Sequence, residues 1–181
     1  LLHMIGGVDV PSEGLVIVDG LNLEKMNREA LALYRRRKVG FIFQQYNLIP
    51  DLNVYDNILF PLELDGRQID KNFIRELMEV LNISNKKEML PSMLSGGEQQ
   101  RVAIARALGA KPSIILADEP TGNLDTMASH DVIGLLKILA KQYQQTIILI
   151  THDGDIAQMT DRIVRIEDGK IRKGSEPYAG K

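Results

Sequence analysis

The chain contains no cysteine among its 181 residues. This absence excludes disulfide frameworks, thiolate nucleophiles and zinc–thiolate sites. No apolar run reaches the roughly 20 residues that a membrane-spanning helix needs. Acidic and basic residues nearly balance, at a formal net charge of −2, so no overall positive field points to a nucleic-acid partner. What remains is a chain long enough for a single domain, residues 1–181, built around a sizeable core.

Three short apolar runs predict strands that are buried on both faces of a parallel sheet. They span residues 39–43, 113–117 and 146–150, and none alternates polar with apolar side chains. Between the last two runs, residues 126–143 predict a helix, whose apolar stripe consists of Val132, Leu135, Leu136, Leu139 and Tyr143. Strand, helix and strand in this order predict a right-handed crossover, which is typical of an α/β fold.

The middle of the chain predicts helices instead of strands. Residues 54–64 and 70–81 have the periodicity of two amphipathic helices, and an Asp-Gly pair separates them. We therefore expect a helical subdomain at residues 46–95, inserted into the α/β core.

The two ends of the chain carry shorter signals. Residues 14–18, followed by Asp19 and Gly20, predict a strand that enters a tight turn. Residues 163–172 predict a terminal hairpin. Residues 1–7 have the pattern of a helix end that stops at glycine.

The segment at residues 94–98, Leu-Ser-Gly-Gly-Glu, opens a strong helical pattern over residues 99–110. Ser95 and Glu98 have the spacing of a capping box, which by itself predicts only the start of a helix. Each glycine in a helix costs roughly 1 kcal/mol relative to alanine, so a plain cap does not explain two of them. Paired glycines at a helix start favour the close approach of an anion, most often phosphate, to the unpaired N–H groups.

Polar side chains follow each of the three predicted strands. Asp118 and Glu119 follow the second strand, Gln44 follows the first and His152 follows the third. Ligands of parallel α/β sheets bind beyond the carboxyl ends of the strands. There, Asp118 could hold Mg²⁺ through water, and Glu119 could orient or deprotonate an attacking water.

Each of these residues also has a structural interpretation. The two acids could be solvated at a strand exit, the histidine could be a packing or surface residue, and the glutamine could be a loop amide. Gln45 is an alternative to Gln44, which we prefer because it directly follows the strand. Residues 120–125 predict a turn in which Asp125 caps the helix that begins at Thr126.

Together these segments resemble the nucleotide-binding domain of ATP-binding cassette (ABC) transporters. The matching motifs occur in the family's order: Gln44 as the Q-loop, residues 94–98 as the signature, 114–119 as Walker B, 123–125 as the D-loop and His152 as the switch histidine. Residues 43–50 and 118–125 look most like the branch that serves lipoprotein release, macrolide efflux, antimicrobial-peptide export and the bacterial cell-division ABC complex.

The resemblance implies a P-loop NTPase fold of the ABC type and an ATP-hydrolysing subunit of a bacterial transporter, with ATP and Mg²⁺ as cofactors. Two such domains would close head to tail around two ATP molecules. Ser95, Gly96 and Gly97, with Glu98 of the same motif, would bind the γ-phosphate of ATP held mainly by the opposite subunit. Asp125 would lie at the seam between the subunits.

The resemblance also divides the remaining roles. Glu119 and His152 would act on the attacking water, whereas Asp118 and Gln44 would act on the metal, with Gln44 also taking part in catalysis. The helical subdomain and the Q-loop would dock an integral membrane permease and report the nucleotide state to it. The expected location is cytoplasmic, peripheral on the inner face of the membrane, with no nucleic-acid partner.

The sequence departs from the family pattern at its N-terminus. The Walker A pattern, G-x-x-x-x-G-K followed by Ser or Thr, occurs nowhere in it. Residues 1–7 resemble the family helix that starts directly after that loop, so the loop and its strand would precede Leu1. That strand is internal to the family's sheet, and its loss would leave an unpaired strand edge and a gap in the core.

We therefore expect a cassette that is incomplete at its N-terminus and that hydrolyses little or no ATP by itself. One alternative is a non-catalytic remnant that cannot bind ATP tightly because Walker A is missing. Another is a soluble ABC ATPase acting on DNA or ribosomes. Chromosome-maintenance types insert a long coiled coil between Q-loop and signature, whereas residues 45–93 show no sustained heptads.

Overall fold

The computed structural model describes residues 1–172 of the chain. They belong to two compact units, the first of which is Leu1–Ile150, while the second begins at Thr151. The expectation of a single domain over residues 1–181 stays a prediction. The first unit holds the sheet and most of the candidate site residues.

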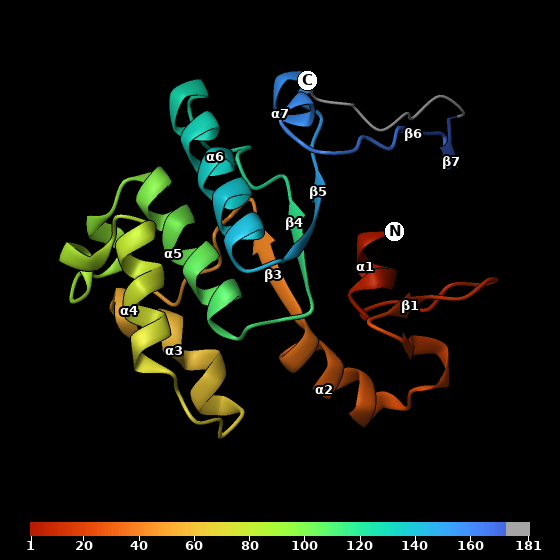
Figure 1. Cartoon of the computed structure of the whole chain (residues 1–181), viewed down its shortest axis with the longest axis horizontal. Coiled ribbons are helices and arrows are strands. Elements are labelled where there is room, and N and C mark those ends of the chain that lie inside the picture. The colour runs from red at the N-terminus through yellow and green to blue at the C-terminus, as the bar shows by residue number, and fades with distance from the viewer. Residues whose placement is uncertain (173–181) are drawn as a thin grey trace. The chain divides into compact units, whose positions relative to one another are not determined.

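A three-stranded parallel sheet in the order β3-β4-β5 forms the centre of the first unit. The strands are β3 (Val39–Phe43), β4 (Ile114–Asp118) and β5 (Thr146–Ile150). The last residue of each strand is paired with the last residue of its neighbour. The carboxyl ends of all three strands therefore meet at one edge of the sheet (Figure 1).

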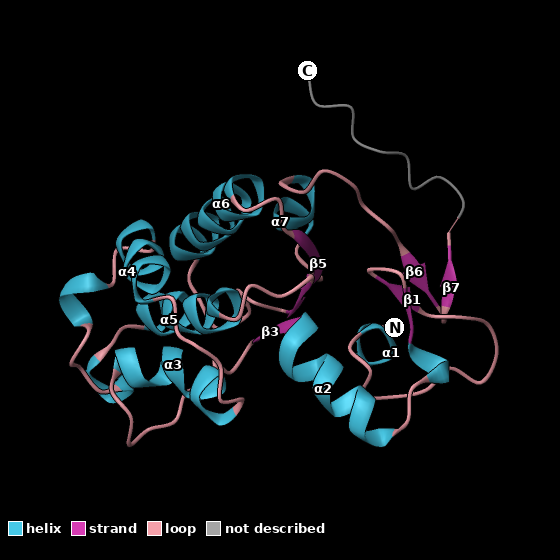
Figure 2. Cartoon of the chain, turned by 60° about the horizontal axis from the view of Figure 1, so that its bottom comes forward, coloured by secondary structure: helices cyan, strands magenta, loops and turns pink. Residues whose placement is uncertain are grey.

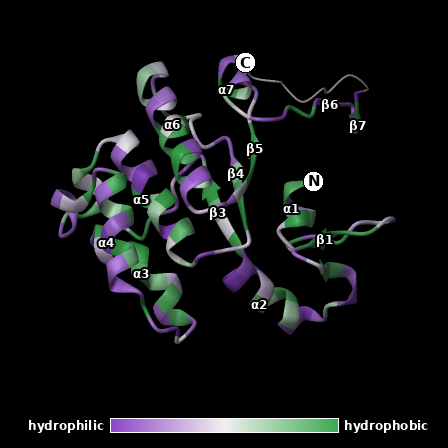
Figure 3. Ribbon diagram, in the orientation of Figure 1, coloured by the Kyte–Doolittle hydropathy of each residue, from purple (hydrophilic) through white to green (hydrophobic). Residues whose placement is uncertain are grey.

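The two neighbours of β4 explain why this strand is the most deeply buried. Its residues Ile114 to Ala117 are all buried, as the sequence predicts for a central strand. The expectation that residues 146–150 are buried on both faces is wrong, because Thr146 and Ile150 are exposed and the residues between them are half-buried. Although β5 is mostly hydrophobic (Figure 3), no strand among residues 1–172 covers its second edge.

Helices pack beside the sheet and connect it to the middle of the chain. The helix α5 (Gly96–Gly109) contacts β3, α6 (Thr126–Gln142), α3 (Val54–Leu64) and α4 (Lys71–Val80). Figure 2 shows α5 lying between α3 and α4. The helices predicted at residues 54–64, 70–81, 99–110 and 126–143 are all present. Between β3 and α5 the only other elements are short 3-10 helices at Ser84–Lys86 and Pro91–Met93.

Side-chain caps set the starts of the long helices. In each case an Asn, Asp or Ser accepts a hydrogen bond from the backbone of the first turn, which satisfies an N–H group that has no partner within the helix. The caps are Asn27 for α2 (Arg28–Lys38), Asn53 for α3, Asp70 for α4, Ser95 for α5 and Asp125 for α6.

The N-terminal elements contribute to an apolar cluster that also includes residues of β3 and β4. These elements are α1 (Leu2–Ile5), the hairpin of β1 (Ile17–Val18) and β2 (Leu21–Asn22), and a 3-10 helix at Leu23–Lys25. The predicted tight turn is confirmed, since Asp19 and Gly20 join the two strands with φ of 51° and 74°. The strands themselves are shorter than expected.

Tyr34 anchors α1 to α2. Its hydroxyl donates to the carbonyl oxygen of Ile5 at 2.8 Å, and Arg35 donates to that of Gly7 at 2.7 Å. Tyr34 is buried in one apolar cluster with Leu2, Leu23, Val39, Ile114 and Leu116. Burial raises the pKa of the Tyr34 hydroxyl to about 12.

An ion-pair cluster links α2 to the end of α3. The Asp65 side chain, only 2% exposed, accepts from Arg37 at 2.7 Å and from Arg36 at 3.2 Å. The hydrogen bond from Arg37 lowers the pKa of Asp65. The carboxylate therefore ties the first turn after the α3 helix to the end of the helix that precedes β3.

The second unit contains α7 (Gly154–Gln158), capped by Asp153, and a hairpin of β6 (Ile166–Glu167) and β7 (Lys170–Ile171). Its turn, Asp168-Gly169, is the turn that the sequence predicts, although the strands are shorter than expected. In the part of the chain that the structure describes, no helix is both long and apolar enough to cross a membrane.

We predict that Leu116→Ala destabilises the fold by about 2–5 kcal/mol, because it removes a fully buried side chain from the central strand and leaves a cavity. The measurement is the urea midpoint followed by circular dichroism. Ile138→Ala, at a residue of α6 that is 56% exposed, is the control and should lower stability far less. Equal losses for the two variants would contradict the central position of β4.

Candidate nucleotide site

The carboxyl edge of the sheet brings three predicted site residues together. Asp118 ends β4 and is paired with Phe43, the last residue of β3. Gln44 and Glu119 therefore leave the sheet side by side, on strands that are spaced about 4.8 Å apart. The structure thus places Gln44, Asp118 and Glu119 at one edge, where the sequence predicts them, while their chemical roles stay predictions.

Glu119 has an unusual backbone conformation. Its φ is +45°, a left-handed value that is uncommon and strained for a residue with a side chain. Backbone hydrogen bonds hold it on both sides: its N–H donates to the carbonyl oxygen of Ile150 at 3.0 Å, and its own carbonyl oxygen accepts from the N–H of Gly122 at 3.0 Å. The half-buried Glu119 therefore lies in a turn whose conformation is fixed by these two backbone hydrogen bonds.

The loops that follow β3 and β4 are joined by a reciprocal amide pair. Asn123 Nδ2 donates to the backbone oxygen of Gln44 at 2.9 Å, and Gln44 Nε2 donates to Asn123 Oδ1 at 3.2 Å. The Gln44 side chain lies against Gly122, where an added Cβ would be 2.7 Å from Nε2. Gly122 is therefore needed for this close approach.

The helix α5 is tied to both loops by buried or partly buried polar side chains. Arg106 donates to the carbonyl oxygens of Tyr46 at 2.7 Å and Asn47 at 2.5 Å. These two residues have φ of 57° and 48°, so the guanidinium holds a left-handed turn of the loop after β3. Gln100, fully buried, donates to the carbonyl oxygen of Pro120 at 2.5 Å. Burial lowers the pKa of Arg106.

The start of α5 is the predicted capping box. Ser95 N–H donates to Glu98 Oε2 at 2.8 Å, and Glu98 N–H donates to Ser95 Oγ at 3.3 Å. Lys86 also pairs with Glu98 at 3.2 Å. The backbone N–H of Ser95 is the main cause of the lowered pKa of Glu98. The Glu98 carboxylate is thus occupied within its own chain.

Two further predicted residues lie in different surroundings. Asp125 Oδ1 accepts from the N–H of Ala128 at 2.8 Å, which confirms its predicted cap of α6. His152 belongs to the second unit and is exposed, directly before the Asp153 cap of α7. Its role on the attacking water stays a prediction.

Comparison with known proteins bears on this arrangement. Residues 1–122 match the protein family described as ABC transporter. The putative ABC transporter ATP-binding protein MG467 of Mycoplasma genitalium is 43% identical over 94% of this chain and 55% of its own length. The lipoprotein-releasing system ATP-binding protein LolD of Bordetella pertussis is 37% identical over 95% of this chain and 75% of LolD. The chain belongs to the ABC transporter family.

Solved structures agree with this membership. The dimeric structure of MJ0796, a bacterial ABC transporter cassette, superposes with a TM-score of 0.84 at 37% identity, covering 99% of this chain and 80% of that chain. A post-hydrolysis state of the same cassette, bound to ADP and Pi, gives 0.83 at 36% identity. The predicted ABC-type α/β fold is confirmed, and the remnant alternative is not favoured. This chain spans about half the length of its mycoplasma relatives.

Within the ABC signature, the two glycines have different surroundings. A Cβ at Gly96 would lie 2.8 Å from the Tyr46 hydroxyl and 3.3 Å from Leu124. The groups that approach the Gly96 backbone closely are therefore side chains of the same chain. A Cβ at Gly97 would meet only Ala128, at an ordinary 3.7 Å. Packing within the chain therefore explains the glycine at residue 96. It does not explain the glycine at residue 97, where the close approach of a phosphate stays a prediction.

The Walker B and Q-loop residues fit a magnesium ion held mainly by nucleotide and water. No group of three or more His, Cys, Asp or Glu among residues 1–172 is arranged to hold a metal. Asp118 and Gln44 offer one carboxylate and one amide oxygen. That small set of oxygen donors suits Mg²⁺, which keeps several waters and takes further ligands from substrate phosphates.

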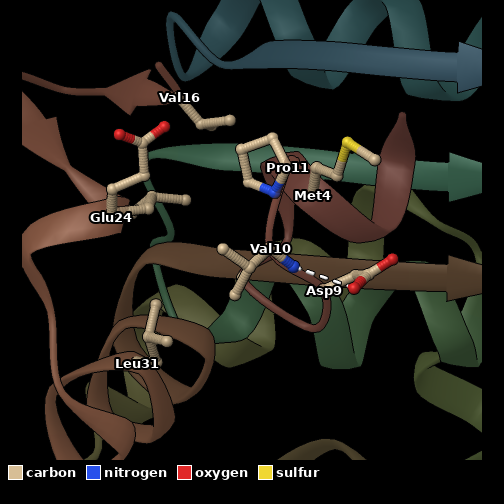
Figure 4. A pocket seen from close by; sticks show the side chains of 9 residues that line it. Met4, Asp9, Val10, Pro11, Val16, Glu24 and Leu31 are labelled. Carbon is tan, nitrogen blue, oxygen red and sulfur yellow. Dashed lines mark hydrogen bonds between the residues drawn. The ribbon is translucent and has the colours of Figure 1, made fainter. Parts of the chain in front are cut away.

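Two hollows in the first unit differ in size and position. A small apolar cavity of about 10 Å³ lies among the N-terminal elements, lined by Met4, Val10, Pro11, Val16 and Leu31 among others (Figure 4). Its volume is about that of one water probe, too small for a nucleotide. A groove of about 380 Å³ lies between the Q-loop and the segment before the signature, lined by Gln45, Asn47, Leu48, Pro50, Pro91, Ser92 and Gln99.

Three residues that organise the site, Arg106, Gln100 and Tyr46, were not predicted from the sequence. Arg106 and Gln100 bind loops that lie 59 and 20 residues away along the chain. No local pattern marks such contacts, because each depends on how the helix packs. Tyr46 has only one local signal, its position two residues after the Q-loop glutamine.

We predict that alanine affects stability differently at the two signature glycines. Gly97→Ala should stabilise the fold by up to about 1 kcal/mol, because the site is open and alanine favours helix. Gly96→Ala should be less stable than Gly97→Ala, because the new methyl group forces the Tyr46 hydroxyl to move. Urea unfolding of both variants measures the difference.

Removing the Tyr46 hydroxyl provides the control. In a Tyr46→Phe background, Gly96→Ala should recover part of the lost stability. If the background makes no difference, the hydroxyl is not what requires a glycine at residue 96.

Proposed function

We propose that this chain is the ATP-binding and ATP-hydrolysing part of a bacterial ABC transporter, and that it powers transport through a separate membrane permease. The observation that carries the proposal is the meeting of Gln44, Asp118 and Glu119 at the carboxyl edge of a parallel sheet. The family membership of the chain supports it. The loop that follows β4 at this edge also contacts the signature helix, because Gln100 of α5 donates to the carbonyl oxygen of Pro120.

Glu119 is the proposed general base. Its carboxylate would orient or deprotonate the water that attacks the γ-phosphate, and the left-handed turn would hold it in place. Asp118, directly or through water, and Gln44 would hold Mg²⁺, which supplies charge neutralisation on the phosphates when it is bound. His152 would help to hold the water in line.

The signature would act on the nucleotide of a second copy. MJ0796 is described as dimeric, and we propose a head-to-tail pair for this chain. Ser95, Gly96 and Gly97 at the start of α5 would then contact the γ-phosphate held by the partner, where the helix dipole favours negative charge. Ser95 is exposed, and packing does not require a glycine at Gly97, which supports contact with a ligand from outside. Asp125 would lie at the seam.

These residues do not supply the Walker A loop, which in the family binds the phosphates of the nucleotide held by the same subunit. No G-x-x-x-x-G-K pattern occurs in the sequence, so we propose that the chain by itself hydrolyses little ATP. The uncovered edge of β5 supports this, because its backbone groups can pair with a further strand of the sheet.

The groove beside the Q-loop is the proposed docking site for the permease. It is lined by Gln45 on one side and by Ser92 and Gln99, which flank the signature, on the other. A membrane partner bound there would contact both the Q-loop and the start of α5. A subunit docked in this way would be cytoplasmic and peripheral on the inner face of the membrane.

The proposed base is tested in a fusion that places the N-terminal segment of Bordetella pertussis LolD, up to the position aligned with Leu1, before this chain. The fusion should hydrolyse ATP, and Glu119→Gln should lower the rate by about 100-fold or more, as removal of a general base does. ATP binding and the ATP-bound dimer should persist in the variant. Asp131→Asn, at an exposed acid of α6, is the matched control. Full turnover by Glu119→Gln would show that Glu119 is not the base.

The trans contact is tested separately with Ser95→Arg in the same fusion. The long cation should block closure of the pair, so ATP-dependent dimers seen by light scattering should disappear while monomeric ATP binding remains. Ser84→Arg, at an exposed serine of a 3-10 helix, is the control for added charge and size. Unchanged dimerisation by Ser95→Arg would refute the trans site.

A further inference from the structure

We propose that Asn123 is a positioning residue that orients the side-chain amide of Gln44, so that its oxygen, and not its nitrogen, is offered to the cation of bound nucleotide. The inference rests on the proposed function, because Gln44 meets a cation only if the chain takes part in binding Mg·ATP. It concerns whether the oxygen or the nitrogen of the Gln44 carboxamide faces the metal, which the identity of the metal ligands does not determine.

The orientation of Asn123 is set first. Its Nδ2 lies 2.9 Å from the backbone oxygen of Gln44. A carbonyl oxygen only accepts hydrogen bonds, so the Asn123 amide must present its nitrogen there. Its Oδ1 consequently points to the other side, toward the Gln44 side chain.

The orientation of Gln44 follows from that of Asn123. Asn123 Oδ1 only accepts, and the Gln44 amide atom next to it, at 3.2 Å, must therefore be the donor Nε2. Oxygen and nitrogen of an amide are distinguished by such hydrogen-bond networks. With Nε2 committed to Asn123, the Gln44 Oε1 is the end that this pair leaves for another partner.

Gly122 completes the seat for this amide. An added Cβ there would lie 2.7 Å from Gln44 Nε2 and 2.9 Å from Cδ. The nitrogen side of the amide thus packs against bare backbone, and any side chain at residue 122 would push it away. Gly122 and Asn123 together determine both the place and the direction of the Gln44 side chain.

The direction matters because of what lies next to Gln44. The strand register sets it beside Glu119, one residue beyond the paired Phe43 and Asp118. A hard divalent cation takes oxygen ligands, and an amide that presented its N–H groups would repel it. Hydrogen bonds from outside the ligand shell commonly fix ligand orientation, and their loss costs about 10- to 100-fold in metal affinity.

The first experiment uses the chain as it is and reads the amide directly. In a ¹⁵N-labelled sample, Gln44→Glu identifies the Gln44 side-chain NH₂ signals by their disappearance. We expect these signals to shift and their proton exchange to accelerate in Asn123→Ala. Asn85→Ala, at an exposed asparagine in the 3-10 helix Ser84–Lys86, should leave them unchanged.

The second experiment measures metal affinity in the LolD fusion. Mn²⁺ is titrated in the presence of ATP and followed by electron paramagnetic resonance. We expect Asn123→Ala and Gly122→Ala to weaken Mn²⁺ binding by about 10-fold. The KM for ATP at saturating metal and the urea midpoint should stay close to those of the unaltered fusion. If the substitutions only destabilised the fold, the urea midpoint would fall as well.

The outcomes separate this inference from the proposed function. A fusion that neither binds nor hydrolyses ATP before any substitution refutes the proposed function, and this inference with it. An active fusion whose Mn²⁺ affinity is the same in Asn123→Ala refutes only the positioning role. Gln44 amide signals that do not respond to Asn123→Ala refute it equally.

Discussion

The register of three parallel strands is the constraint on which the rest of the candidate site depends. Phe43, Asp118 and Ile150 lie side by side as the last residues of their strands. A shift of one strand by one residue would reverse the face of every side chain on it. It would also separate Gln44 from Glu119 at the sheet edge. The burial of β4 between two neighbours holds this register, because its apolar residues have no other place to avoid water.

The helix α5 makes the signature and the strand exits parts of one body. Its N-cap is Ser95, and Gln100 and Arg106 along the helix bind the loops after β4 and β3. The Gln44–Asn123 pair joins those two loops to each other. A displacement of one of these three segments therefore stretches hydrogen bonds to the other two. These hydrogen bonds form a direct physical route between the start of α5 and the loop after β3.

Local rules predicted much of the fold, because the relevant signals are short. The bounds of β3, β5 and α3 are those expected from residues 39–43, 146–150 and 54–64, since apolar runs and caps set them. Burial of β5 was not predictable, because the exposure of a strand depends on which strands lie beside it. The sequence likewise could not show that the Tyr46 hydroxyl lies against Gly96.

The site residues were predictable for a different reason than the contacts that hold them. Gln44, Asp118 and Glu119 each follow a recognisable strand, so topology alone brings them to one edge. The Gln44–Asn123 pair joins residues 79 apart, and the Arg106 bonds join residues 59 and 60 apart. Such contacts are settled by the packing of whole elements, for which the sequence carries no periodic signal.

The backbone of Glu119 shows how the fold holds a carboxylate at the end of β4 on a strained turn. A left-handed conformation costs a residue with a side chain about 1–3 kcal/mol. The hydrogen bonds to Ile150 and from Gly122 each contribute about 1 kcal/mol net. Burial of Pro120 and Thr121 in the same turn adds further stabilisation. The strain is therefore of the same size as the interactions that offset it, and the turn holds one conformation. A carboxylate carried on such a turn needs little reorganisation when water and phosphate meet it, which is the condition for effective general-base catalysis.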